Sequence, residues 1–208
     1  MIRCVLLDAL GTLVELEPPW PLLAAELGVE ADDAERAMRA EMRYYRDHSD
    51  EGRDPDSLAG LRRRCAGIVS AELGREVTPE QLMAAIRFRA YPDAGPALAE
   101  LRGMGLRLVC VSNWDVSLPS VLARCGLADG LDAVVTSAGV GARKPDVAIF
   151  TAALELAGCE PAEALHVGDT AGEDVDGARA AGIRALLIDR SGGGDIESLA
   201  AIRHHLDS

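Results

Sequence analysis

Five short apolar runs, spaced along the chain, predict five buried strands. The runs are rich in β-branched residues and nearly continuous rather than alternating, which is typical of strands whose two faces are both covered. We therefore expect strands within IRCVLLDA (2–9), LRLVCVSN (106–113), DAVVTSA (132–138), ALHVGDT (164–170) and RALLIDR (184–190).

Helix-like stretches separate the last four runs. They are PSVLARCGL (119–127), KPDVAIFTAALELAG (144–158) and EDVDGARAAG (173–182). Regular alternation of strands and helices produces right-handed crossovers between parallel strands. The pattern therefore predicts an α/β fold with a Rossmann-like parallel sheet.

The first two strands are separated by a long region, roughly 15–91, in which no strand is expected. Helices are expected in PPWPLLAAELG (18–28), DAERAMRAEMRYYRDH (33–48), SLAGLRRRCAGIVSAELG (57–74) and TPEQLMAAIRFRA (78–90). The last begins with Thr78, Pro79 and Gln81 in a capping-box arrangement. We predict a Rossmann-like core formed by residues 1–14 and 92–208, carrying a small all-helical cap at 15–91.

Charge and composition exclude several classes of protein. The formal net charge is −13, and no block of basic residues offers a face for phosphate backbones, so nucleic acid is not an expected partner. No apolar run approaches the roughly 20 residues that span a bilayer, and the first residues do not resemble a signal peptide. The five cysteines show no CxxC or CxxH spacing, so neither disulfides nor zinc are expected. A cytoplasmic protein is the simplest interpretation.

Lysine is almost absent from this chain. Of 21 Lys and Arg residues, only Lys144 is a lysine. A bias towards arginine explains the other basic residues but not this exception. A position that keeps lysine can need a compact ammonium, which the planar guanidinium does not imitate.

Polar side chains follow three of the predicted strands. In open α/β sheets, ligands bind beyond the carboxyl ends of the strands. Singly, each polar residue could cap a turn or a helix, but together they would converge on one crevice. The candidates are Asp8, Ser112, Asn113, Lys144, Asp169 and Asp174.

In order and spacing, these motifs resemble those of the haloacid dehalogenase superfamily, in the group with a helical cap after the first strand. The matching segments are DALGTLV (8–14), VSN (111–113), KP (144–145) and GDTAGED (168–174). The resemblance covers nearly the whole chain. Most members of that superfamily are magnesium-dependent phosphatases, so the resemblance implies a small phosphorylated metabolite as the substrate and Mg²⁺ as the cofactor.

The resemblance also implies a role for each motif residue. Asp8 would be the nucleophile that forms a covalent aspartyl intermediate. Ser112 would hold a phosphoryl oxygen, and Lys144 would bind that charge and restrain the nucleophile. Thr12 and Asn113 are assigned to substrate binding. The implied Mg²⁺ ligands are Asp8, the backbone carbonyl of Leu10, Asp169 and Asp174.

Elementary electrostatics agrees with a metal at this place. Three carboxylates in one crevice repel one another, and a nucleophilic carboxylate also repels a phosphate dianion. A hard divalent cation with oxygen ligands relieves both repulsions. Glu173, where the family often has asparagine, is expected to lie behind the ligands or to face solvent.

Leu10 departs from the pattern of the family's phosphatases, which carry a second aspartate two residues after the nucleophile. That acid protonates the leaving group and then activates water, and such help is typically worth about 10²–10⁴-fold. A phosphatase without it would be slow, or selective for leaving groups that need no proton.

Two alternatives follow from the same departure. A 2-haloacid dehalogenase needs no second acid, because halide leaves unprotonated, but it needs a cationic or amide cradle for halide. Arg36, Arg39 and Arg43, at near-helical spacing, could supply one, although a solvated basic face explains them better. Dehalogenases also need no metal, which leaves Asp169 and Asp174 unexplained. The other alternative is a binding or scaffold protein that has lost turnover. The cap normally sets substrate choice, and the sequence does not name the substrate.

Overall fold

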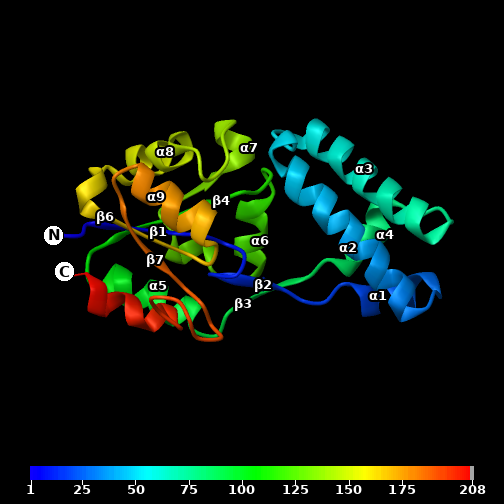
Figure 1. Ribbon diagram of the computed structural model, residues 1–208, viewed down its shortest axis with the longest axis horizontal. Coiled ribbons are helices and arrows are strands. Elements are labelled where there is room, and N and C mark those ends of the chain that lie inside the picture. Colours follow the sequence, from blue (N-terminus) through cyan, green and yellow to red (C-terminus); the bar gives the residue numbers. More distant parts are fainter. Residues whose placement is uncertain (207–208) are drawn as a thin grey trace.

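The computed structural model describes residues 1–206 and is built around a five-stranded parallel sheet (Figure 1). The strand order is β5-β4-β1-β6-β7, and all four pairings are parallel. Each predicted run contains one of these strands, which confirms the α/β fold. The strands are β1 (Cys4–Leu7), β4 (Arg107–Ser112), β5 (Ala133–Thr136), β6 (Ala164–Gly168) and β7 (Arg184–Leu187).

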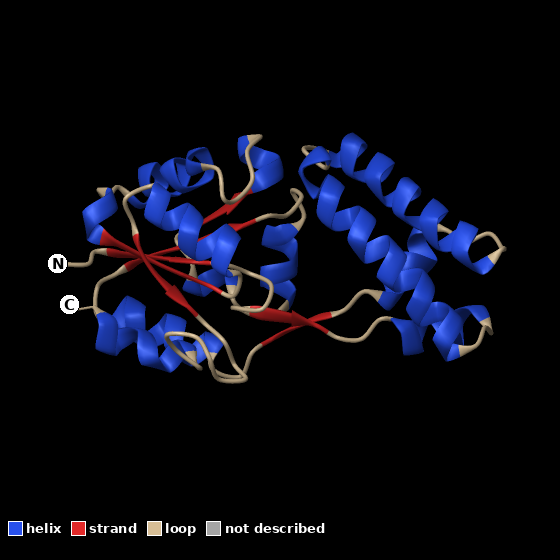
Figure 2. Ribbon diagram, viewed as in Figure 1, coloured by secondary structure: helices blue, strands red, loops and turns tan. Residues whose placement is uncertain are grey.

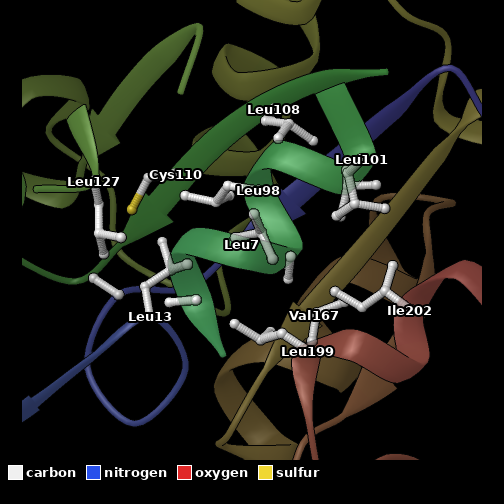
Figure 3. Packing of buried hydrophobic residues seen from close by; sticks show 14 of the residues in the cluster. Leu7, Leu13, Leu98, Leu101, Leu108, Cys110, Leu127, Val167, Leu199 and Ile202 are labelled. Carbon is white, nitrogen blue, oxygen red and sulfur yellow. The ribbon is translucent and has the colours of Figure 1, made fainter. Parts of the chain in front are cut away.

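Helices cover both faces of this sheet, as Figure 2 shows. On one face, Leu7 and Val167 pack with leucines of α5 (Ala94–Gly103) and α6 (Leu118–Arg124) and with the C-terminal 3₁₀-helix Leu199–His205 (Figure 3). On the other face, Leu6 packs with α8 (Val147–Ala157) and α9 (Asp176–Ala180). The short helix α7 (Ser137–Val140) follows β5. Because side chains alternate along a strand, the near-continuous apolar runs supply both layers.

A separate group of four helices, here called the helical unit, lies between β1 and β4 in the sequence. The helices are α1 (Trp20–Leu27), α2 (Ala31–His48), α3 (Pro55–Leu73) and α4 (Pro79–Ala85). They enclose an apolar cluster of their own, which includes Leu23, Met38 and Leu61. The capping box predicted at Thr78 is present. Within residues 1–206, no helix is both long and apolar enough to cross a bilayer.

The region between the first two sheet strands is not entirely helical, which corrects the expectation from the sequence. β2 (Val14–Leu16) pairs antiparallel with β3 (Phe88–Ala90), and α4 ends at Ala85 rather than continuing to residue 90. The two strands form a ribbon that joins the sheet to the helical unit (Figure 1). Each strand has three residues, too few to show a period, and their pairing joins segments far apart in sequence.

The helical unit also touches the sheet unit away from this ribbon. The hydroxyl of Tyr45, in α2, donates to Asp115 Oδ2 at 2.8 Å, and the backbone N–H of Val116 donates to the Gly52 carbonyl at 3.0 Å. Gly52 lies close to Asp115, because a Cβ at residue 52 would meet that side chain at 2.8 Å. These contacts fix the segment after β4, which begins directly beyond Ser112.

Candidate active site

Three adjacent strands place the predicted site residues at one edge of the sheet. Asp8 follows β1, Ser112 ends β4 and Asp169 follows β6. The strands β4, β1 and β6 are neighbours and run parallel, so their carboxyl ends meet. Lys144 arrives from the loop before α8, and Asp174 from a π-helical turn, Ala171–Val175, after β6. The structure therefore brings these five residues together.

Lys144 is the centre of this cluster. Its Nζ lies 2.5 Å from Asp8 Oδ1 and 2.6 Å from Asp174 Oδ1, and its side chain is only 2% exposed. A buried ammonium is tolerated only when it is paired and hydrogen-bonded. The two carboxylates meet that condition, so the one lysine of the chain is a buried link between two acids.

The nucleophile candidate presents one free oxygen. Ser112 Oγ donates to Asp8 Oδ1 at 3.0 Å, and Lys144 binds the same oxygen. Oδ2 of Asp8 receives no hydrogen bond from residues 1–206, so it is the oxygen available to a substrate.

Burial and charge shift the acidity of these groups in opposite directions. Burial raises the pKa of Asp8 to about 7, against the pull of Lys144 and with a further push from Asp174. Burial alone would lower the pKa of Lys144, but Asp8 and Asp174 outweigh it, so the ammonium keeps its proton. Burial alone would raise the pKa of Asp174, but Lys144 and His166 lower it well below its ordinary value.

Two glycines let the carboxylates approach the backbone. A Cβ at Gly11 would lie 1.9 Å from Asp169 Oδ2, and one at Gly168 would lie 2.1 Å from Asp174 Cγ. Gly11 also has φ +88°, which favours glycine on its own. The absence of a side chain at Gly11 and Gly168 therefore leaves the space that Asp169 and Asp174 occupy.

Three carboxylates suit a hard divalent cation. Oxygen atoms of Asp8, Asp169 and Asp174 lie within 4.8 Å of one another. Partial burial raises the pKa of Asp169, and the charge of Asp174 adds to this shift while Thr170 and Lys144 oppose it. The Leu10 carbonyl accepts no backbone hydrogen bond from residues 1–206. Oxygen donors and excess negative charge fit Mg²⁺, which prefers such ligands.

Asn113 and Thr12, the further candidates for substrate binding, differ in their surroundings. Asn113 Nδ2 donates to the Lys144 carbonyl at 3.0 Å and to Glu173 Oε2 at 2.9 Å, and Oδ1 accepts from Lys144 N–H at 2.7 Å. Its amide thus holds the lysine backbone. Thr12 is fully buried, and its hydroxyl has no partner among residues 1–206. Glu173 is half-buried and accepts the hydrogen bond from Asn113.

Sequence reasoning missed His166. It is fully buried in β6, and its Nε2 lies 2.9 Å from Asp174 Oδ1. Burial lowers its pKa, so the ring is neutral at neutral pH, although the Asp174 carboxylate opposes the shift. The available signal was a single polar residue inside the apolar run ALHVGDT.

The arginines considered as a halide cradle pair within the helical unit. Arg36 binds Asp33 at 2.8 Å, and Arg39 binds Glu35 at 2.5 Å and lies over the Trp20 ring. Arg43 is exposed. These contacts match the solvated basic face that explains the arginines best.

A family model described as haloacid dehalogenase-like hydrolase matches residues 2–182. The chain belongs to this family. A phosphoserine phosphatase of Thermus thermophilus is 40% identical over 120 residues, which cover 57% of this chain and 48% of that protein. The chain spans about half the length of the curated relatives that it matches.

Solved structures of both phosphatases and dehalogenases resemble this haloacid dehalogenase-like hydrolase. A HAD phosphatase from Thermococcus onnurineus is 29% identical with a TM-score of 0.70, covering 99% of this chain and 98% of that one. An L-2-haloacid dehalogenase from Xanthobacter autotrophicus, with chloropropionic acid covalently bound, is 26% identical with a TM-score of 0.68, covering 91% and 78%. The fold is therefore common to phosphatases and dehalogenases, and the site must distinguish them.

Proposed function

We propose that this hydrolase is a Mg²⁺-dependent phosphatase of small phosphorylated metabolites that acts through an aspartyl intermediate. One observation carries the proposal: the carboxylates of Asp8, Asp169 and Asp174 lie together, and among residues 1–206 the only ammonium paired with them is that of Lys144, which binds Asp8 and Asp174. When bound there, Mg²⁺ would be held by these acids and the Leu10 carbonyl, and it would neutralise charge on the acids and on a phosphoryl group.

Asp8 Oδ2 attacks phosphorus, because Oδ1 is already bound by Ser112 and Lys144. The new bond joins Oδ2 to phosphorus, the ester P–O bond breaks, and its electron pair leaves with the substrate oxygen. Lys144, charged and fixed, stabilises negative charge that develops on the phosphoryl oxygens. Ser112 offers a hydroxyl donor beside the same position.

Water then attacks phosphorus and releases phosphate, which returns Asp8 as a carboxylate. Leu10 cannot donate a proton to the leaving oxygen or take one from this water. We therefore infer that the enzyme favours leaving groups that depart unprotonated, such as those of acyl and aryl phosphates. The helical unit serves as the cap over the site, held by the β2–β3 ribbon and by Tyr45.

The alternative, a 2-haloacid dehalogenase, is supported by Leu10 and by the dehalogenase neighbours. The hydrogen bonds of Asn113 weigh against it, because both amide N–H groups are engaged and cannot cradle a halide. The pairing of Arg36 and Arg39 within the helical unit weighs against a cationic cradle.

The test compares an aryl phosphate, an acyl phosphate and 2-chloropropionate, each with Mg²⁺ and with a chelator. We expect phosphate release only with Mg²⁺, loss of that release in Asp8→Asn, and parent-like release in Asp176→Asn, a matched change at an exposed acid. Chloride release that persists with the chelator would instead establish the dehalogenase. No turnover of any substrate would favour the scaffold alternative.

A second experiment concerns Leu10. Its side chain is 42% exposed, so the helical unit does not enclose it as an apolar pocket would. Leu10→Asp therefore adds a largely solvated acid beside the leaving oxygen. We expect kcat/KM for an alkyl phosphate to rise more than for an aryl phosphate, by less than the full ~10²–10⁴-fold. Equal changes for both substrates in a folded variant would show that the missing acid does not limit turnover.

A further inference from the structure

His166 is an unusual residue for its position. It lies in the central part of the sheet, fully buried, with its ring edge-on to Phe150 at a centroid distance of 5.2 Å. The surrounding cluster is apolar and includes Leu6, Val109 and Ile149. Burying a polar group without a partner is unfavourable, and Nδ1 has no hydrogen-bond partner among residues 1–206. An aliphatic residue would fill this place without that cost.

The other ring nitrogen has a specific partner. His166 Nε2 lies 2.9 Å from Asp174 Oδ1. A carboxylate oxygen can only accept, so Nε2 carries the hydrogen and Nδ1 is a bare acceptor.

Asp174 is held from three directions. Oδ1 accepts from His166 and from Lys144 at 2.6 Å, and Oδ2 accepts from the Thr170 backbone N–H at 3.0 Å. Of these three donor residues, only His166 lies in a strand of the sheet. Gly168 leaves the space in which the carboxylate sits against the strand.

We propose that His166 is a positioning residue, which holds Asp174 so that the Lys144 ammonium is fixed against Asp8. The ammonium shares Asp174 Oδ1 with His166, so a shift of that carboxylate moves Lys144 as well. Only the kinetic consequences of this inference rest on the proposed phosphatase function.

The single lysine makes this inference measurable without turnover. Protein labelled with ¹³C-lysine gives one side-chain Hε–Cε signal, which reports on the Lys144 ammonium. The comparison uses His166→Gln and His166→Met, side chains of similar length of which only glutamine has an N–H donor. Phe150→Leu is the packing control, because it removes the ring contact but keeps the bond to Asp174.

Without added metal, we expect the Lys144 signal to move in His166→Met and to stay near the parent position in His166→Gln and Phe150→Leu. With an aryl phosphate and Mg²⁺, kcat in His166→Met should fall about 10–100-fold with KM within about twofold, as for other residues that orient a ligating side chain without touching the substrate. A folded His166→Met with the parent signal would overturn the inference, whether or not the protein proves to be a phosphatase.

A measurement on the parent protein covers the case in which His166→Met does not fold. Nitrogen chemical shifts identify the tautomer of a buried imidazole. We expect hydrogen on Nε2 and a bare Nδ1. Hydrogen on Nδ1 alone, with a bare Nε2, would mean that Asp174 receives no donor from the ring, and the positioning role would be wrong.

Discussion

The buried crevice and the outer face of the helical unit contain ion pairs of the same length. Lys144 lies 2.5 Å from Asp8, and Arg39 lies 2.5 Å from Glu35. The side chains of Lys144 and Asp8 are 2% and 7% exposed. Those of Arg39 and Glu35 are 59% and 35% exposed. Water screens the surface pair, whereas the crevice pair depends on its protein partners alone. Distance therefore says little about the consequence of losing a pair, and burial says much more.

A third pair lies between these extremes. Arg190 donates to both oxygens of Asp93 at 3.0 and 3.1 Å and to the Thr12 carbonyl at 2.7 Å, and its guanidinium lies over the Tyr91 ring. The side chains of Arg190 and Asp93 are 22% and 20% exposed. Thr12 and Asp93 flank the β2–β3 ribbon, so this pair fixes both connections to the helical unit.

The largest effect is expected at Lys144. Lys144→Arg keeps the charge, but a planar guanidinium cannot take the place of an ammonium between Asp8 and Asp174. We expect kcat/KM for an aryl phosphate to fall about 10²-fold or more, since small misplacements at a reacting centre have effects of that size. Arg179→Lys, the reverse change on an exposed helix position, should leave kcat/KM unchanged. Parent-like turnover in Lys144→Arg would show that the site does not require lysine at residue 144.

An intermediate effect is expected at Arg190. Removal of a bidentate, partly buried pair by Arg190→Gln should lower the free energy of unfolding by about 1–3 kcal/mol, measured with urea at pH 7. Ser191→Ala, at the neighbouring exposed residue, serves as the control.

The loss at Arg190 should also depend on pH. Partial burial favours a raised pKa for Asp93, but hydrogen bonds from Arg190, Ser198 and Leu199 outweigh it and lower the pKa. The stability from this shift is fully present above the pKa of an ordinary aspartate, about 3.9, and is lost as pH falls through the lowered value. The difference between parent and Arg190→Gln should be constant from about pH 7 to about 5 and shrink below about 3.9. A difference that grows in acid would contradict this account.

The smallest effect is expected at the surface. Arg39→Gln should change the free energy of unfolding by less than about 1 kcal/mol, and a double-mutant cycle with Glu35→Gln should give a coupling of about 0.3–0.5 kcal/mol that salt weakens. A coupling above about 2 kcal/mol would remove the distinction between the buried and surface pairs.

Local pattern in the sequence predicts much of this fold. The strand runs, the capping box at Thr78 and the polar residues at the strand ends follow from hydrophobicity and turn chemistry within a few neighbouring residues. Parallel strands bring their carboxyl ends together, so the strand pattern alone is enough to expect Asp8, Ser112 and Asp169 near one another.

Contacts between distant segments could not be predicted in this way. The β2–β3 ribbon, the Tyr45–Asp115 contact and the bond from His166 to Asp174 depend on how separate elements pack. Asn113 illustrates the same limit, because its position at a strand end does not reveal that its amide bonds to the Lys144 backbone. A side chain's place in the chain indicates a neighbourhood but does not determine its partner.

The close approach of acids to glycines also constrains how this sequence can change over evolutionary time. With Asp174 in place, any side chain at residue 168 would collide with it, and the same holds for Asp169 and residue 11. Gly168 can therefore mutate freely only after Asp174 has been lost, and Gly11 is restricted by its positive φ as well as by Asp169. Once a side chain fills that space, the acid cannot return without first restoring the glycine. Loss of the carboxylates would thus be difficult to reverse, and the order of substitutions along a lineage would matter as much as their identity.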